Sequence, residues 1–180
     1  DHQTIDFDPG PAAETMEGKF RPGHFIGMSE VVYRLLRITS PDSLFMGQKD
    51  FQQFSIIRKL ITDFQMPIQL VMCPTVREAN GLAMSSRNVR LSPEARDKAG
   101  VIFNILTSGK MLFEQKTPAK YVQDIALDAL RKVNFDPEYF EVVNGYTLEP
   151  VEHMEDAEQI VACCAVKVEG VRLIDNMIWK

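Results

Sequence analysis

The chain has 180 residues, of which 45% are hydrophobic and 25% are charged, so it can bury a core as one domain or two small ones. Its net charge of -5 provides no basic excess for nucleic acid. No apolar run reaches the roughly 20 residues of a membrane helix, and the first residues lack the basic and apolar regions of a signal peptide. We therefore expect a cytoplasmic globular protein that binds neither nucleic acid nor a membrane.

The first part of the chain is predicted to contain a strand, a helix and a second strand in succession. Before them, residues 23–40 carry apolar side chains at helical spacing and predict a helix. Residues 43–47 indicate a short buried strand, residues 49–64 a helix, and residues 67–73 a second strand. This order is typical of a βαβ unit, which requires a parallel sheet.

A turn-rich segment after residue 73 predicts a domain boundary, which divides the chain into residues 1–75 and 76–180. Beyond it, Ser92 as an N-cap predicts one long helix over residues 92–115. A further helix is expected over residues 118–132. Strands are expected around residue 139 and over residues 159–168 and 171–177, the last two joined by a hairpin at Glu169-Gly170. The predicted fold class is α/β: a parallel-sheet domain followed by a smaller α+β domain with an antiparallel sheet.

The segment "FMGQKDFQQF" places polar residues where the first strand passes into its helix. If the helix starts at Lys49, Asp50 and Gln53 fall on its sheet-facing side at roughly 100° and 40°, while Gln52, near 300°, is expected to be a solvated surface residue. The carboxyl edge of a parallel sheet is where such folds bind ligands, and Gly47 permits close approach to the backbone. The alternative is that Asp50 only stabilises the helix dipole.

Two other segments concentrate polar groups. In "GLAMSSRN", two hydroxyls and the guanidinium of Arg87 could donate several hydrogen bonds to a phosphate, although a surface turn that caps a short helix explains the same residues. In "EGKFRPGHF", Arg21 and His24 precede a helix, and the default for His24 is a helix-start residue bonded to backbone. His2 and His153 have no partner at a suitable spacing. The three cysteines, odd in number and without a CxxC pair, predict neither disulfides nor a zinc site.

The motifs "EGKFRPGHFIGM", "FMGQKDFQQF" and "GLAMSSRN", followed by "LSPEAR" and "RLIDNM", closely resemble those of the pantothenate synthetase (pantoate–beta-alanine ligase) family over essentially the whole chain. The resemblance implies the tail of a Rossmann-like nucleotidyltransferase domain followed by a smaller domain that closes over the active site. It also implies the reaction. ATP and pantoate form pantoyl adenylate and pyrophosphate with the help of Mg²⁺, and beta-alanine then displaces AMP to give pantothenate. The family is usually homodimeric.

By position, the resemblance assigns the ATP-binding GxKD segment to residues 47–50, with Lys49 neutralising phosphate charge and Asp50 holding the nucleotide. Gln53 matches the pantoate-binding glutamine, and Arg21 matches an arginine near the site. The family often has glutamate where Gln48 stands, and we expect little effect from this difference. The remaining ATP-binding positions are Val76, through its backbone, and Met84, Ser85, Ser86 and Arg87.

Catalysis is assigned by the same resemblance to Lys49, Ser85, Ser86 and Arg87, which would stabilise charge on the leaving pyrophosphate. The segment that contains the two serines looks like the counterpart of the mobile lysine-serine signature of class I aminoacyl-tRNA synthetases.

The family's HxGH motif would lie upstream of residue 1. Because the chain also starts without methionine, we expect an upstream part of the protein and an inactive isolated fragment. Two alternatives stay open: another adenylylating or cytidylylating nucleotidyltransferase of the superfamily, and a non-catalytic binding module.

Overall fold

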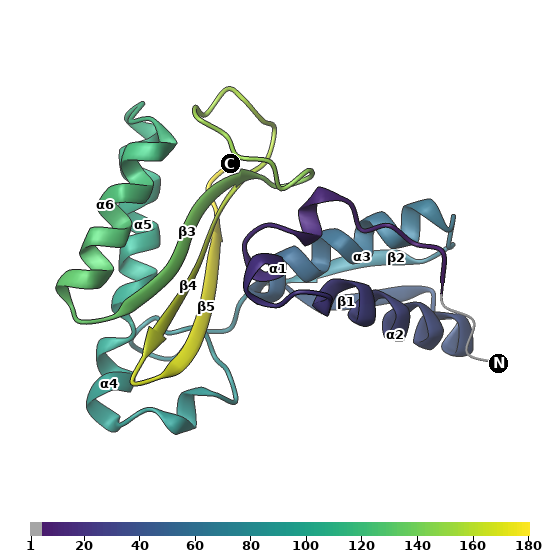
Figure 1. The fold of residues 1–180 in the computed structure, drawn as a ribbon, viewed down its shortest axis with the longest axis horizontal. Helices are drawn as coiled ribbons and strands as arrows, with labels where there is room; N and C mark the ends of the chain where they lie inside the picture. The colour runs from purple at the N-terminus through teal and green to yellow at the C-terminus, as the bar shows by residue number, and fades with distance from the viewer. Residues whose placement is uncertain (1–4) are drawn as a thin grey trace. The chain divides into compact units, whose positions relative to one another are not determined.

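The structure is a computed structural model that describes residues 5–180, so His2 lies outside the described residues. The chain divides into two compact units, Asp1–Cys73 and Pro74–Lys180, coloured from purple to blue and from teal to yellow in Figure 1. The boundary expected from the sequence lies two residues further along the chain. None of the described helices has the length and apolar character needed to cross a membrane.

The first unit contains the predicted βαβ arrangement. Strand β1 (Ser43–Gly47) leads through a 3-10 turn (Gln48–Asp50) into helix α3 (Phe51–Asp63), which returns to strand β2 (Gln69–Cys73). The two strands pair in parallel, with Ser43 opposite Gln69 and Gly47 opposite Cys73. The prediction of a parallel sheet is therefore confirmed.

Three further helical segments precede this sheet. They are a 3-10 helix (Pro11–Ala13), the short α1 (Glu17–Phe20) and α2 (His24–Thr39). Helix α2 starts after Gly23, whose φ of 76° suits a residue without Cβ, so the helix predicted over residues 23–40 is confirmed within one residue at each end. Helices α2 and α3 share a core built from apolar side chains that are at most 8% exposed: Leu36, Ile57, Leu60 and Ile61.

Strand β1 departs from the expectation of a fully buried strand. Leu44 and Met46 pack against the core shared by α2 and α3, but Phe45 points to the opposite face and is 66% exposed. Alternate residues of a strand face opposite sides of the sheet, so one covered face buries only every second side chain. The apolar run at residues 44–46 in β1 could not distinguish one covered face from two.

The second unit is α+β, as predicted. Its sheet has the order β3-β4-β5 and is antiparallel, formed by β3 (Asp136–Asn144), β4 (Ile160–Val168) and β5 (Val171–Ile178). Helices α5 (Val101–Glu114) and α6 (Ala119–Lys132) pack side by side on one face of this sheet (Figure 1). The turn between β4 and β5 has positive φ at Glu169 and Gly170, 49° and 74°, which confirms the predicted hairpin.

The single long helix predicted over residues 92–115 is wrong. The chain forms α4 (Pro93–Lys98), breaks at Ala99-Gly100, and continues as α5. Ser92 does cap α4 as predicted, because its hydroxyl accepts a hydrogen bond from the Ala95 N–H at 3.2 Å. The break allows a close backbone contact, since a Cβ on Gly100 would lie only 2.2 Å from the Asn80 carbonyl oxygen.

Trp179, at the end of the chain, is buried in the core of the second unit. Its indole lies 5.4 Å from the ring of Phe113 on α5 and 6.3 Å from the ring of Phe140 on β3. Helix α5 approaches the indole through Gly109, where an added Cβ would lie 3.0 Å from Trp179 and 3.2 Å from Val122. Trp179 is therefore packed into the core between the helices and the sheet.

Candidate functional site

The segment Gly47–Asp50 lies at the carboxyl end of β1 and directly before α3. Gly47 keeps extended backbone angles, and the 3-10 turn then redirects the chain into the helix. Lys49 is half-buried and Asp50 is exposed, which differs from the buried position predicted for Asp50. The N-terminal end of α3 adds a positive dipole, so this edge of the sheet suits an anionic ligand.

The expectation for Gln52 is wrong. Its side chain was predicted to be solvated, yet the residue is only 5% exposed. The Gln52 amide oxygen accepts a hydrogen bond from the Glu17 N–H at 3.0 Å, and its nitrogen donates to the carbonyls of Ala12 at 2.6 Å and Thr15 at 3.0 Å. Gln53, which follows it, is half-buried.

The burial of Gln52 has a physical cause. The helical wheel treated α3 as covered only by the sheet, but the segment at residues 11–18 covers a second face of its first turn. The segment folds tightly. Met16 has a φ of 43°, and a Cβ added to Gly18 would clash with the Ala13 carbonyl oxygen, only 1.7 Å away. The partners of Gln52 lie 35 to 40 positions before it in the chain. No local pattern in the sequence signals contacts between segments so far apart.

His24 interacts electrostatically with both Arg21 and Asp50. Burial and the nearby Arg21 charge lower the pKa of His24 below its ordinary value of 6.5, while the carboxylates of Glu17 and Asp50 act in the opposite direction. The His24 backbone N–H donates to the Arg21 carbonyl at 3.1 Å, so His24 does begin α2 as expected. The first unit thus brings together Arg21, His24 and Asp50, next to Lys49 and Gln53 in the sequence.

The second group of predicted residues lies on a small hairpin, defined here as residues 76–84. Arg77 pairs with Ala83 as an antiparallel bridge, and the Met84 N–H donates to the Val76 carbonyl at 2.9 Å. Val76 and Met84 are 66% and 53% exposed, so their apolar side chains are open to solvent. The structure therefore places these two predicted ATP-binding positions opposite each other on one hairpin.

Ser85, Ser86 and Arg87 follow the hairpin directly. The Ser85 hydroxyl accepts a hydrogen bond from the Arg87 N–H at 3.2 Å, and a short 3-10 helix (Asn88–Arg90) begins there. Ser86 and Arg87 are exposed. Within residues 5–180 the Arg87 guanidinium makes no ion pair, so its charge is accessible to an anionic ligand.

The buried side chain of Asn88 stabilises the turn at residues 85–87. Asn88 is 1% exposed, and its side-chain nitrogen donates to the Glu78 carboxylate at 2.7 Å and to the Ala83 carbonyl at 3.1 Å. Glu78 in turn accepts two hydrogen bonds from Arg96 on α4, at 2.8 and 3.0 Å. The hydrogen bonds from Arg96, and secondly from Asn88, lower the pKa of Glu78, so this carboxylate stays charged to a lower pH than an ordinary glutamate does.

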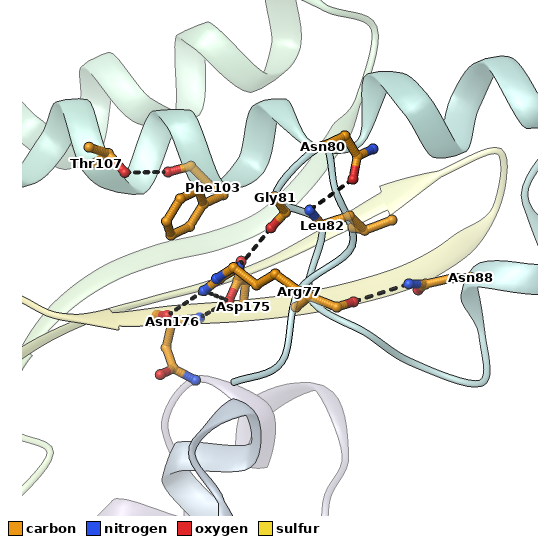
Figure 2. A network of polar contacts seen from close by, with 10 residues as sticks. Arg77, Asn80, Gly81, Leu82, Asn88, Phe103, Thr107, Asp175 and Asn176 are labelled. Atoms are coloured by element: carbon orange, nitrogen blue, oxygen red, sulfur yellow. Dashed lines mark hydrogen bonds and ion pairs between the residues drawn. The ribbon is translucent and has the colours of Figure 1, made fainter. Parts of the chain in front are cut away.

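On its other side the hairpin is bonded to the sheet. The Arg77 guanidinium donates to both oxygens of the Asp175 carboxylate on β5, at 2.6 and 3.0 Å (Figure 2). Sequence reasoning singled out neither residue, although Asp175 lies in the quoted "RLIDNM". The two residues are 98 positions apart, and no local pattern connects them.

The fold and these motifs match those of known proteins. A family model described as pantoate-beta-alanine ligase matches residues 3–178. The chain belongs to the pantoate-beta-alanine ligase family. It is 41% identical to the pantothenate synthetase of Porphyromonas gingivalis W83 over 174 residues, which is 97% of this chain and 62% of that protein. It is 40% identical to the pantothenate synthetase of Bacteroides fragilis YCH46 over 180 residues, which is 98% of this chain and 63% of that one.

Solved structures of the pantoate-beta-alanine ligase family share the fold. The pantothenate synthetase of Thermus thermophilus superposes with a TM-score of 0.89 at 35% identity, over 98% of this chain and 63% of that chain. The ligase of Francisella tularensis, solved with beta-gamma ATP and beta-alanine, gives a TM-score of 0.69 at 31% identity, over 93% and 55% of the two chains. The chain thus spans less than two thirds of the length of these relatives.

Proposed function

We propose that this chain contributes to an ATP-dependent ligase that joins pantoate to beta-alanine through a pantoyl adenylate. The observation that carries this proposal is the position of the segment Gly47–Asp50 and of Gln53 at the carboxyl end of a parallel strand, in a chain whose family match spans residues 3–178. In the first half-reaction the pantoate carboxylate attacks the α-phosphorus of ATP and pyrophosphate leaves. In the second, the beta-alanine amine attacks the acyl carbon and AMP leaves.

The residues of the first unit would bind the adenylate and pantoate. The backbone of Gly47 and Gln48 leads into the N-terminus of α3, whose dipole favours phosphate. Lys49 would neutralise phosphate charge, and the exposed Asp50 carboxylate can accept hydrogen bonds from ribose hydroxyls. The Gln53 amide has both a donor and an acceptor, which suits the hydroxyl and carboxylate of pantoate. Arg21, in the same electrostatic cluster, would add positive charge.

The residues of the second unit would bind the phosphates that leave. Val76 offers its backbone, and Ser85, Ser86 and Arg87 offer two hydroxyls and an exposed guanidinium on one turn. Hydrogen bonds from this turn would stabilise the negative charge that develops on pyrophosphate. Met84 lies opposite Val76 on the hairpin and exposes an apolar side chain that would pack on the nucleotide.

Mg²⁺ belongs to this proposal as the counter-ion of ATP. Residues 5–180 contain no group of three His, Cys, Asp or Glu side chains arranged to hold a metal ion. Mg²⁺ commonly keeps several waters and binds through substrate phosphates with one or two carboxylates, so a MgATP substrate fits these residues without a protein cage. We further propose a cytoplasmic homodimer, as the resemblance implies.

Substitution of Gln53 tests the pantoate assignment. Gln53→Ala in the full-length protein should raise the pantoate KM by about 10-fold to 100-fold, because about two hydrogen bonds to substrate are lost. The KM for MgATP should change less than about 2-fold. Pantoate-dependent release of pyrophosphate measures both constants. An unchanged pantoate KM would contradict the assignment of Gln53 to pantoate binding. It would favour a different acceptor substrate, as in a related nucleotidyltransferase.

A further inference from the structure

We propose that Arg77 and Asp175 form a positioning pair that fixes the hairpin at residues 76–84 to strand β5, and thereby presents Ser85–Arg87 in a preformed conformation. That these residues then receive phosphate rests on the proposed function. The pair itself does not touch substrate in this proposal. Its role is to hold the backbone from which the binding groups project.

The pair has the geometry of a strong and specific contact. The two terminal guanidinium nitrogens of Arg77 donate to the carboxylate, one to each oxygen, and the side chains are 18% and 3% exposed. A bidentate contact fixes the orientation of the guanidinium as well as its position, and low exposure limits screening by water. Removal of one partner would leave the other charge largely buried without its counter-ion.

Arg77 also binds the turn of its own hairpin. One guanidinium nitrogen donates to the Gly81 carbonyl at 3.0 Å, and the guanidinium lies 4.0 Å from the centre of the Phe103 ring on α5 (Figure 2). Gly81 has a φ of 94°, and an added Cβ would lie 3.1 Å from Phe103. One side chain therefore connects the hairpin turn, helix α5 and strand β5.

The constraint passes from Arg77 to the binding turn through few bonds. The Arg77–Ala83 bridge and the hydrogen bond from Met84 to Val76 join the two arms of the hairpin. Asn88 holds the next turn to the carbonyl of Ala83. A displacement of Arg77 would therefore move Ala83 and the adjacent residues, whereas the exposed side chains of Ser86 and Arg87 stay available for a ligand.

Amide hydrogen exchange tests the positioning role without any ligand. We expect Asp175→Asn to speed exchange in residues 78–88 by about 10-fold or more, with little change in α6 and β3, because local opening is restrained by the pair. Arg77→Lys, which cannot bind both carboxylate oxygens in a fixed plane, and Phe103→Leu should give smaller increases in the same residues. If Asp175→Asn does not fold, these two milder variants provide the same test.

The matched control is a second ion pair on the same sheet. Glu138 on β3 accepts from Arg172 at 2.7 Å, and these side chains are 8% and 19% exposed; the other Glu138 oxygen lies 3.1 Å from the Lys167 ammonium. Glu138→Gln removes a charge of similar burial from β3, which β4 separates from β5, and we expect exchange in residues 78–88 to stay within about 2-fold of the original rate. Equal acceleration by Glu138→Gln and Asp175→Asn would overturn the proposal, since both would then act through general destabilisation.

Titration with MgATP in the full-length protein tests the consequence for binding. We expect Asp175→Asn and Arg77→Lys to raise the dissociation constant by about 10-fold, and Glu138→Gln to leave it unchanged. Loss of folded protein would lower the amplitude of the titration but not change this constant. Faster exchange with an unchanged constant would overturn the positioning role. If the unsubstituted protein binds no MgATP, the proposed function fails, and the exchange data alone decide whether the pair fixes the turn.

Discussion

Two adjacent glutamines at the start of α3 perform different tasks. Gln52 is enclosed by the segment at residues 11–18 and makes three hydrogen bonds to its backbone, whereas Gln53 is half-buried beside the proposed ligand edge. A change of one position therefore separates a residue that shapes the first unit from one that would bind pantoate. The stability and the substrate affinity should respond separately to substitutions at these two sites.

Gln52→Leu should lower the free energy of unfolding by about 2–3 kcal/mol, because the Glu17 N–H and the carbonyls of Ala12 and Thr15 lose their partner in a buried place. Urea denaturation followed by circular dichroism measures this change. Gln53→Leu is the matched control, with the same chemical change at a half-buried position, and should cost less than about 1 kcal/mol. Equal losses in the two variants would contradict the assigned roles.

His24 should titrate below its ordinary pKa of 6.5, mainly because burial disfavours the imidazolium and secondly because Arg21 is close. The unfolded chain then takes up a proton before the folded one does. His24 should therefore stabilise the fold less as the pH falls below 6.5, with no further loss once the pH is below the pKa of the folded state.

Proton NMR of the His24 ring measures this titration. Arg21→Gln should raise the pKa, and Asp50→Asn should lower it further, because the charge of Arg21 lowers the pKa and the charge of Asp50 raises it. Shifts of the same sign in the two variants would contradict the electrostatic cluster.

At the scale of elements, the break between α4 and α5 shows how a distant turn overrides a local pattern. Residues 92–115 have a helical period throughout, so the sequence predicts one helix. The Asn80 side chain donates to the carbonyls of Arg96 and Asp97 at 2.8 and 2.9 Å, which ends α4 and brings the turn close to Gly100. The glycine in the pattern was the only local sign of this contact.

Gly109 on α5 is a second close contact that helical propensity alone would misjudge. Alanine favours a helix over glycine by about 1 kcal/mol, but here a Cβ would meet the Trp179 ring at 3.0 Å and Val122 at 3.2 Å. We expect Gly109→Ala to lower the free energy of unfolding by about 1–3 kcal/mol in chemical denaturation, since a packed core resists added volume. Ser108→Ala, at an exposed position in the same helix, should be neutral or slightly stabilising. Stabilisation by Gly109→Ala would contradict the tight packing.

At the scale of the whole molecule, local patterns predicted most of the elements. The parallel pairing of β1 with β2 and the β4–β5 hairpin follow from apolar runs, turn residues and connection lengths, all of which act within short stretches of chain. The resemblance supplied the candidate site residues. The pair of Arg77 with Asp175 and the contacts of Gln52 were not predicted, because each joins segments that only the folded chain brings together.

The burial of Trp179 gives the second unit an optical label of its own. The chain has one tryptophan, and its indole is 3% exposed against Phe113 and Phe140. Its emission therefore reports the melting of residues 74–180, whereas far-ultraviolet circular dichroism also records the helices of the first unit. Two denaturation curves from one sample thus reveal whether the units lose their structure together or in sequence, with no added dye.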